Sequence, residues 1–150
     1  MRRPGREITS LVDRYFAEYA SYHTDRRNLV CHEIGIPLIV WAIFSLLELV
    51  RIGPIDLGAV VGALIIIFYL TLDVRLGLVA LIGFATLYVA GRFTPWPIAV
   101  AAFLAGWILQ FAGHGYEGKK PAFFTNLIHL LVGPLWICSL LMRRDRVTLP

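Results

Sequence analysis

Long uncharged stretches separated by short charged segments dominate the chain. These stretches run over 34–47, 57–72, 76–91, 93–116 and 121–142. A membrane-spanning helix needs about 20 mostly apolar residues, so the last two stretches are long enough as they stand. The first becomes long enough if the flanking Glu33 and Glu48 reach back to the membrane interface. The pattern therefore predicts membrane helices over 33–50, 57–72, 76–91, 93–114 and 121–142.

The two middle stretches are short, and the charged segment Asp73-Val74-Arg75 divides them. They form either two thin spans or one short helical hairpin over 57–91 that enters the membrane and returns. In both cases the pair ends on the side of the membrane where it began. The predicted fold class is an all-α integral membrane protein, a bundle of about five transmembrane helices in a single domain over 1–150.

The first residues show the pattern of an amphipathic helix over 7–22. Its apolar and aromatic positions recur at helical spacing, and they are Ile8, Leu11, Val12, Tyr15, Tyr19 and Tyr22. A helix of this kind lies in the membrane interface. The segment lacks the apolar core of a secretory signal peptide. Charged residues at 25–27 end this helix, and Asn28 is expected to cap the first span.

Composition excludes a water-soluble domain. Hydrophobic residues make up 58% of the chain, charged residues make up only 16%, and the mean hydropathy is +0.71, whereas average domains carry about 25% charged residues. The net charge of +4 suits anionic lipid headgroups. No basic face interleaved with exposed aromatic residues indicates a nucleic-acid partner.

The distribution of basic residues predicts the orientation in the membrane. With five crossings and the N-terminus inside, nine lysines and arginines fall on the inner side and five on the outer side. The basic C-terminus argues in the opposite direction. We expect a cytoplasmic N-terminus, and the twelve arginines against two lysines favour a bacterial inner membrane, or the endoplasmic reticulum in a eukaryote.

This topology brings the four histidines together. His32 opens the first span, and four crossings later the chain is back on the same side at His114. His129 follows Pro121 by about 12 Å of helical rise in the last span. His23 ends the interfacial helix on that side. All four histidines are therefore expected within one layer at the inner membrane face.

Each histidine on a predicted span has an amide side chain three or four residues before it. Asn28 precedes His32 and Gln110 precedes His114 by one helical turn. The last span is expected to carry a polar stripe formed by Thr125, Asn126, His129 and Gly133. The amides are therefore placed to orient the rings or to bind a substrate oxygen.

Taken singly, the histidines have ordinary explanations. His23 alone is typical of a solvated interfacial residue, and His32 or His114 alone of a helix end. His129 lies in an apolar stretch, where an ionisable side chain indicates function. Four histidines in one layer favour a metal site, because neutral imidazole is the commonest side-chain metal ligand and suits zinc or iron.

Two carboxylates adjoin these histidines, and their role is open at this stage. Glu33 and Glu117 either complete a carboxylate-containing metal site or form surface ion pairs with Arg26, Lys119 or Lys120. Surface pairing is the favoured interpretation for Glu117.

Several segments together resemble a known family. They are Tyr22-His23, residues 28–37 (NLVCHEIGIP), residues 110–117 (QFAGHGYE), Lys120-Pro121-Ala122 and residues 129–134 (HLLVGP). They are similar to the 2-hydroxy fatty acid dioxygenases of the Mpo type, and the resemblance covers roughly residues 10–142. The combination of N-x-x-x-H-x-x-G-x-P with Q-x-x-G-H-x-x-E carries it, and both motifs are complete here.

The resemblance implies an iron(II)-dependent enzyme of alpha-oxidation that uses O₂ to convert a long-chain 2-hydroxy fatty acid into the acid one carbon shorter. The iron ligands it implies are His32, His114 and His129, with His23 as a fourth ligand or an acid–base group. The other residues it implies in the site are Asn28, Gln110 and Glu117, with Arg26 or Arg27 steering the substrate carboxylate.

Two other classes of function are compatible with the pattern. A metal-binding transporter or membrane electron carrier would use histidine pairs as metal ligands or as axial ligands of haem. A structural membrane protein would leave the histidines solvated and would bind no stoichiometric metal.

Overall fold

The computed structural model of the chain describes residues 10–142, which are mostly helical. The helices are α1 (Leu11–Ser21), α2 (Arg26–Leu47), α3 (Leu57–Leu72), α4 (Val74–Gly91), α5 (Trp96–Glu117) and α6 (His129–Leu141), with the short 3-10 helix η1 (Ala122–Phe124) before α6. Two short antiparallel strands, β1 (Arg51–Ile52) and β2 (Ile55–Asp56), join α2 to α3. The predicted helical class is confirmed, whereas the strand pair was not predicted.

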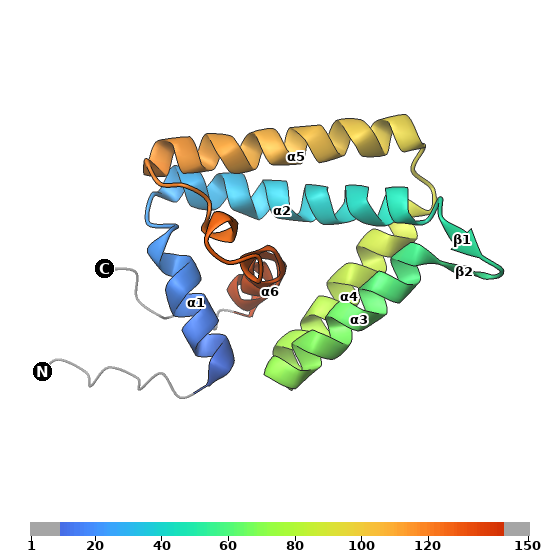
Figure 1. The fold of residues 1–150 in the computed structure, drawn as a ribbon, viewed down its shortest axis with the longest axis horizontal. Coiled ribbons are helices and arrows are strands. Elements are labelled where there is room, and N and C mark those ends of the chain that lie inside the picture. Colours follow the sequence, from blue (N-terminus) through green and yellow to red (C-terminus); the bar gives the residue numbers. More distant parts are fainter. Residues whose placement is uncertain (1–9, 143–150) are drawn as a thin grey trace, which may run out of the picture.

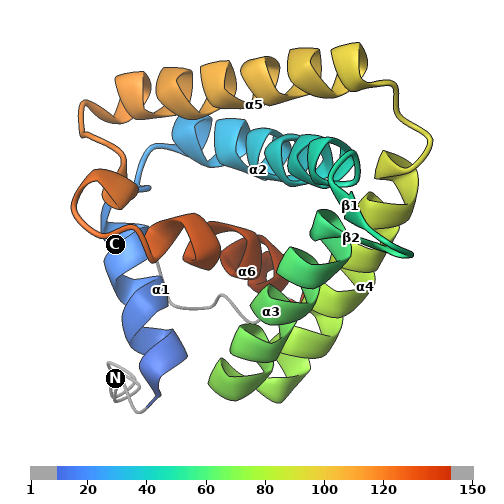
Figure 2. The ribbon, with the colours of Figure 1, turned by 45° about the vertical axis from the view of Figure 1, so that its right-hand side comes forward.

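The two longest helices, α2 and α5, lie side by side and run antiparallel (Figure 1). Figure 2 shows α6 below this pair, between α1 on one side and the α3–α4 hairpin on the other. Because α2 and α5 are antiparallel, the start of α2 and the end of α5 lie at the same end of the molecule. This arrangement brings His32 and His114 together, as the crossing pattern predicts.

Aspartate side chains cap the N-termini of both helices in the α3–α4 hairpin. Asp56 and Asp73 each accept a hydrogen bond from the amide three residues further on, at 2.8 and 3.0 Å, and so act as N-caps. The Tyr88 hydroxyl donates to Asp56 at 2.5 Å, which places the end of α4 beside the start of α3. The hairpin thus begins and ends at one end of the molecule.

The two longest helices are displaced from the expected spans: α2 covers 26–47 where 33–50 is expected, and α5 covers 96–117 where 93–114 is expected. α2 begins at Arg26 because Asp25, and not Asn28 as predicted, is its N-cap: the Asp25 carboxylate accepts from the Arg27 amide at 2.8 Å. α5 continues to Glu117 and ends at Gly118, whose φ of +68° is readily adopted only by glycine. Charged residues bound the uncharged stretches here without ending the helices.

The last predicted span, 121–142, is interrupted. Irregular backbone separates η1 from α6, which begins only at His129. The Asn126 side chain accepts from the Ile128 amide at 3.1 Å, and the Thr125 hydroxyl donates to the Ala122 carbonyl at 2.7 Å. Such bonds compete with helical hydrogen bonding. The predicted polar stripe therefore does not form, since Thr125 and Asn126 lie outside the helix.

α1 corresponds to the expected amphipathic segment, of which residues 7–9 lie outside the described part of the chain. Ser10 caps the helix by accepting from the Asp13 amide at 3.2 Å. Val12 and Tyr19 are buried, and Tyr19 packs in a cluster with Val132 and Trp136 of α6. The apolar face of α1 therefore packs largely against the rest of the protein.

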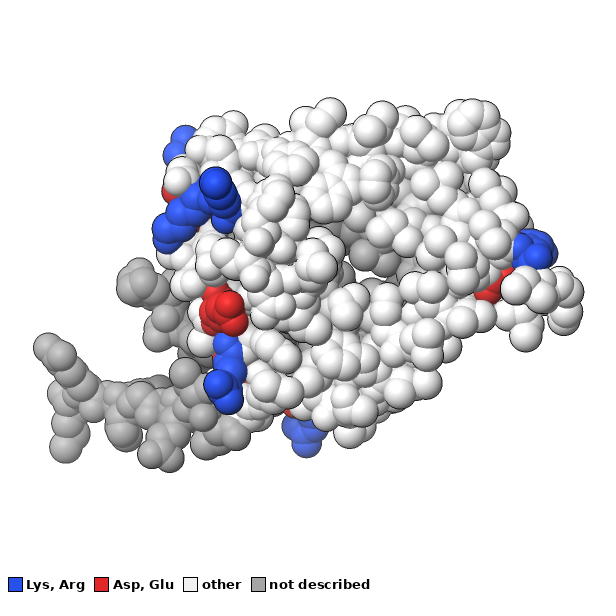
Figure 3. Space-filling view, viewed as in Figure 1, with Lys and Arg blue, Asp and Glu red and all other residues white. Residues whose placement is uncertain are grey.

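Three helices, α2, α4 and α5, are long and apolar enough to cross a membrane, and α3 and α6 are shorter apolar helices. Charged side chains gather near the edges of the face shown in Figure 3, and most of that face is uncharged. Many large apolar side chains are exposed, among them Leu64 (62%), Ile82 (69%) and Ile108 (66%). Such extensive apolar exposure is typical of a surface that contacts lipid.

Candidate metal centre

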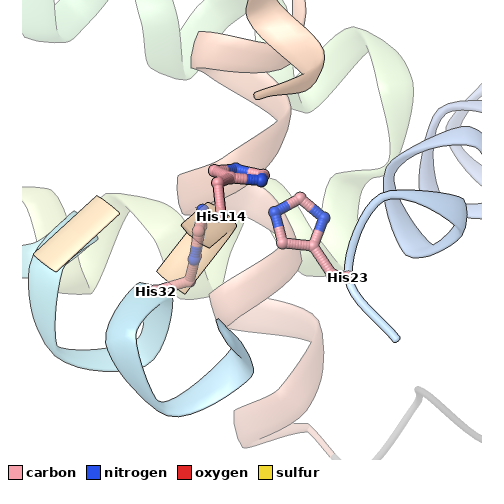
Figure 4. A group of neighbouring side chains, drawn as sticks. All are labelled: His23, His32 and His114. Carbon is pink, nitrogen blue, oxygen red and sulfur yellow. The ribbon is translucent and has the colours of Figure 1, made fainter. Parts of the chain in front are cut away.

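Three histidine rings meet at the end of the molecule where α2 begins and α5 ends. His23 lies between α1 and α2, His32 in α2 and His114 in the last turn of α5, and Figure 4 shows their rings turned toward one another. The ring centroids are 4.4 Å apart for His23 and His32, 5.0 Å for His23 and His114, and 4.8 Å for His32 and His114. All three are buried, with one donor atom of each within 4.8 Å of the others.

Backbone carbonyls fix the protonation of two of these rings. The Nδ1 atoms of His23 and His32 lie 2.6 and 2.9 Å from the carbonyl oxygens of Tyr19 and Asn28. A carbonyl oxygen only accepts, so each Nδ1 carries the proton and each Nε2 keeps its lone pair. This is the usual arrangement of a metal-binding histidine, whose other ring nitrogen donates to a carbonyl or carboxylate.

Buried ring nitrogens without hydrogen-bond partners favour a ligand at this site. Nε2 of His23 and Nδ1 of His114 are buried and have no hydrogen-bond partner, a state that proteins rarely leave uncompensated. Burial, followed by the neighbouring His32, lowers the pKa of His23 to about 3, so this ring is neutral at pH 7. Three buried imidazole rings that face one another fit a divalent transition metal such as iron(II).

His129, which was expected among the ligands, does not join this group of three. Its Nε2 lies 3.1 Å from a carboxylate oxygen of Glu18 on α1, and both ring nitrogens are buried without a hydrogen-bond partner. The ring is beside Tyr19 and Tyr22, with centroid distances of 6.2 and 6.4 Å. His129 nevertheless lines the same cavity as the three clustered histidines.

That cavity has a volume of about 240 Å³ and joins polar and apolar walls. Its polar lining residues include the four histidines and Gln110, whose buried Nε2 has no hydrogen-bond partner. Most of the remaining wall is apolar and comes from α2, α3, α4 and α6. The predicted amide Gln110 is therefore at the site, as an unpaired donor rather than as a partner of His114.

The other two predicted polar residues hold the loop that carries His23. The Glu117 carboxylate accepts hydrogen bonds from the backbone amides of Thr24 at 3.0 Å and of Asp25 at 2.8 Å. It also accepts from the side-chain amide of Asn28 at 3.1 Å and from the Thr24 hydroxyl. It thus bonds this loop instead of forming the ion pair favoured from the sequence. Asn28 contacts His32 through its backbone carbonyl and not through its side chain.

The two arginines considered for substrate steering lie at the surface. The Arg27 guanidinium pairs with Asp25 at 2.9 Å and lies 4.5 Å from the centroid of the Tyr116 ring. Arg26 is exposed at the start of α2. Neither lines the cavity.

Tyr19 is a site residue that the sequence pattern assigned only to the apolar face of α1. Its ring stacks on His23 with a centroid distance of 4.0 Å and an interplanar angle of 16°, and it lines the cavity. Burial raises the pKa of the Tyr19 phenol, so the hydroxyl stays protonated. The one-turn spacing of Tyr19 and His23 is a signal that places two side chains in contact on a helix.

Apolar helices, three of them long enough to cross a membrane, surround a buried histidine triad at the head of an apolar cavity and define a helical protein with a candidate metal centre. Comparison with known proteins specifies the family. The chain belongs to the Mpo1-like family, described as 2-hydroxy-palmitic acid dioxygenase Mpo1-like, which matches residues 9–145. The resemblance seen in the sequence motifs is thus confirmed.

A curated relative supports the same assignment. The chain is 35% identical over 121 residues to the 2-hydroxy-palmitic acid dioxygenase MPO1 of Saccharomyces cerevisiae. The aligned part covers 76% of this chain and 69% of the yeast protein. No solved structure matches the chain.

Proposed function

We propose that this protein is an iron(II)-dependent dioxygenase that shortens long-chain 2-hydroxy fatty acids by one carbon. The reaction balances with one O₂: the bond between the carboxyl carbon and the hydroxyl-bearing carbon breaks, and the products are the shorter acid, CO₂ and water. Dioxygen accepts all the electrons that the cleavage releases, so no further reductant is needed. The family and the name of the yeast relative support this substrate class.

One observation carries the proposal: a buried triad of histidines heads a cavity whose remaining wall is largely apolar. A 2-hydroxy fatty acid has the matching shape, with two adjacent oxygen groups at one end and a hydrocarbon chain behind them. The polar end fits beside the histidines and the chain fits along the apolar wall. Burying the chain favours binding by about 0.8 kcal/mol for each methylene.

His23, His32 and His114 are the residues that would hold iron, through their inward ring nitrogens. Iron bound there would supply the activation of dioxygen that the protein's own side chains do not provide. Three ligands from the chain leave coordination positions for substrate and for O₂. His129 stands apart from the triad in the same cavity, and its Nε2 lies 3.1 Å from a carboxylate oxygen of Glu18.

Two further side chains of the cavity suit the polar end of the substrate. The unpaired amide of Gln110 can donate a hydrogen bond to a carboxylate or hydroxyl oxygen, which would relieve its unsatisfied state. The Tyr19 hydroxyl, kept protonated by burial, is a second donor. Together they would orient the acid so that its hydroxyl-bearing carbon faces the triad.

The triad also bears on the haem alternative. The three rings contact one another nearly edge to face, at interplanar angles between 64° and 89°. A flat macrocycle between two axial ligands would have to separate such rings. The geometry therefore favours a mononuclear metal over haem.

We place the protein in a membrane with the histidine end at the cytoplasmic face. In this arrangement α2 and α5 cross the bilayer, the α3–α4 hairpin enters it and returns to the same side, α6 lies within it, and α1 lies at the interface. Three helices are long and apolar enough to cross a membrane, and the charged side chains lie near the edges of a largely uncharged face (Figure 3). Both observations support this placement. The excess of basic residues on the predicted inner side supports a cytoplasmic N-terminus, and a bacterial inner membrane is the proposed location.

Mass spectrometry on purified, iron-loaded protein tests the reaction. With 2-hydroxypalmitate labelled at the carboxyl carbon, we expect labelled CO₂, the unlabelled shorter acid, and O₂ consumption in equal amounts. Palmitate without the hydroxyl serves as the matched control and should be inert. Recovery of intact labelled acid from iron-loaded, folded protein would contradict the proposal.

A further inference from the structure

The apolar part of the cavity follows one face of α2 from the triad to the opposite end of the molecule. After His32, the residues of α2 that line it are Ile36, Ile39, Val40, Ile43 and Phe44. Their spacing of three and four residues puts them on one helix face. From His32 to Phe44 the helix rises about 18 Å at about 1.5 Å per residue. The hydrocarbon of one membrane leaflet is of similar length, about 15 Å, or half of the ~30 Å core.

Two aromatic rings stand at the far end of this path. Phe44 of α2 and Phe84 of α4 meet edge to face, with centroids 5.5 Å apart at 79°, and both are buried. Tyr69 of α3 backs Phe84 at 5.9 Å and is itself held by a 2.5 Å hydrogen bond to the Leu131 carbonyl. The pair is therefore supported by Tyr69 of α3, which is itself bonded to α6.

A second cavity lies behind these rings. It has a volume of about 370 Å³ and is lined by small residues of α3, including Gly58 and Gly62, and by the α4 face that carries Phe84. Phe44 and Phe84 line both cavities. Phe44 also packs against Gly62, where a Cβ atom would lie 3.1 Å from the ring. The two rings thus form the partition between the cavities.

We propose that Phe44 and Phe84 are the specificity-determining end wall of the alkyl site and set the longest fatty acid that the enzyme accepts. This inference rests on the proposed function, because it assumes that the polar end of the substrate lies at the triad. Each methylene buried before the wall strengthens binding about fourfold. A chain that reaches the wall must displace a packed ring, which costs more than it gains.

Substitutions of opposite effect test the wall. Phe84→Ala and Phe44→Leu open the second cavity, whereas Val40→Phe fills the path halfway along α2. The matched control is Phe68→Ala, which removes a ring of α3 that lines neither cavity. The catalytic efficiency, kcat/KM, is measured for 2-hydroxymyristate, 2-hydroxypalmitate, 2-hydroxystearate and 2-hydroxybehenate.

We expect the efficiency of the unmodified enzyme to drop at least about tenfold between the stearate and the behenate derivative, the size of the gain from two methylenes. Opening the wall should raise the behenate-to-palmitate ratio by about tenfold or more. Val40→Phe should shift the optimum to 2-hydroxymyristate, and Phe68→Ala should leave the profile unchanged. An unchanged profile in Phe44→Leu and in Val40→Phe would overturn the wall, even if Phe84→Ala does not fold.

Binding without turnover separates this inference from the proposed function. The same acids are titrated against metal-free protein while tryptophan fluorescence is recorded, because Trp107 lines the cavity. A length preference that shifts in the variants supports the wall even if no acid is oxidised, in which case only the proposed reaction fails. If the acids are oxidised and every variant has the same chain-length preference, the proposed reaction stands and the proposed end wall is wrong. Binding that is independent of chain length also overturns it.

Discussion

Gly35 of α2 and Gly106 of α5 face each other so closely that neither position has room for a side chain. A Cβ atom on Gly35 would lie 3.0 Å from the Gly106 carbonyl oxygen, and a Cβ atom on Gly106 would lie 3.0 Å from the Gly35 carbonyl oxygen. Small residues at a helix contact allow this approach of two backbones. Gly35 lies one turn from His32, and Gly106 lies one turn from Gln110. The contact therefore sets the distance between α2 and α5 at the site.

Gly106→Ala is therefore expected to weaken metal binding without removing any ligand. The added methyl group meets backbone as well as Ile39, so α2 and α5 must separate and carry His32 away from His114. We expect the affinity for iron to fall by about tenfold or more, as for other changes that disturb ligand orientation. Anaerobic iron titration of the metal-free protein measures it.

Gly115→Ala is the matched control for this change. Gly115 is on the same helix, and a Cβ atom there would meet nothing within 4 Å. The control should bind iron as the unmodified protein does. Equal iron affinity of the Gly106→Ala and Gly115→Ala proteins would show that the close contact does not set the site.

Removing the histidines one at a time distinguishes ligands from neighbours. His23→Ala, His32→Ala and His114→Ala should each lose stoichiometric iron while still inserting into membranes, since insertion depends on apolar length and flanking charge. His129→Ala should keep its iron, because this ring lies outside the triad. Elemental analysis of anaerobically purified proteins provides the measurement. If His129→Ala loses iron as His32→Ala does, His129 is a ligand.

The sequence predicts helices best where charged residues both end an apolar stretch and cap a helix. α3 coincides with the expected 57–72 because Asp56 and Asp73 do both. α2 begins before its expected start and α5 continues past its expected end, because a charged residue marks the limit of apolar surface without breaking a helix. The interruption before α6 was missed, since hydropathy does not register the local hydrogen bonds of Thr125 and Asn126.

At the site, too, the features that follow from the crossing pattern were predicted, whereas those that depend on local backbone and packing were not. The juxtaposition of His32 and His114 follows from the return of the chain to one side, and the structure shows it. The position of His129 does not follow, because its expected depth assumes a continuous helix from residue 121. The stacking of Tyr19 on His23 was also missed, since a tyrosine on the apolar face of an amphipathic helix is usually a packing residue.

Glu117 is expected to act on metal binding through the loop that carries His23. Its carboxylate accepts hydrogen bonds from Thr24, Asp25 and Asn28, so Glu117→Gln replaces an acceptor oxygen by a donor and loosens the loop. We expect an iron affinity about 10–100-fold lower, with the same overall fold by circular dichroism.

The exposed Glu33, next to His32, provides the comparison. Glu33→Gln should leave iron affinity unchanged, because three histidines suffice as ligands. A loss of iron in Glu33→Gln that exceeds the loss in Glu117→Gln would instead support the carboxylate-containing site that the sequence left open.

The buried, neutral His23 should make the metal-free protein lose stability on acidification. Burial, followed by the nearby His32, lowers the pKa of His23 from 6.5 to about 3. Between these values the unfolded chain takes up a proton that the folded chain does not, so stability falls as the pH falls from 6.5 toward 3. The free energy of unfolding lost through this one residue approaches about 1.4 kcal/mol for each pH unit.

His23→Gln removes the titrating group, so the melting temperature in non-ionic detergent should fall less steeply in this variant between pH 6.5 and 5. Parallel curves for the two metal-free proteins would mean that His23 is accessible to protons in the folded state, and that the site is more open to water than its burial indicates.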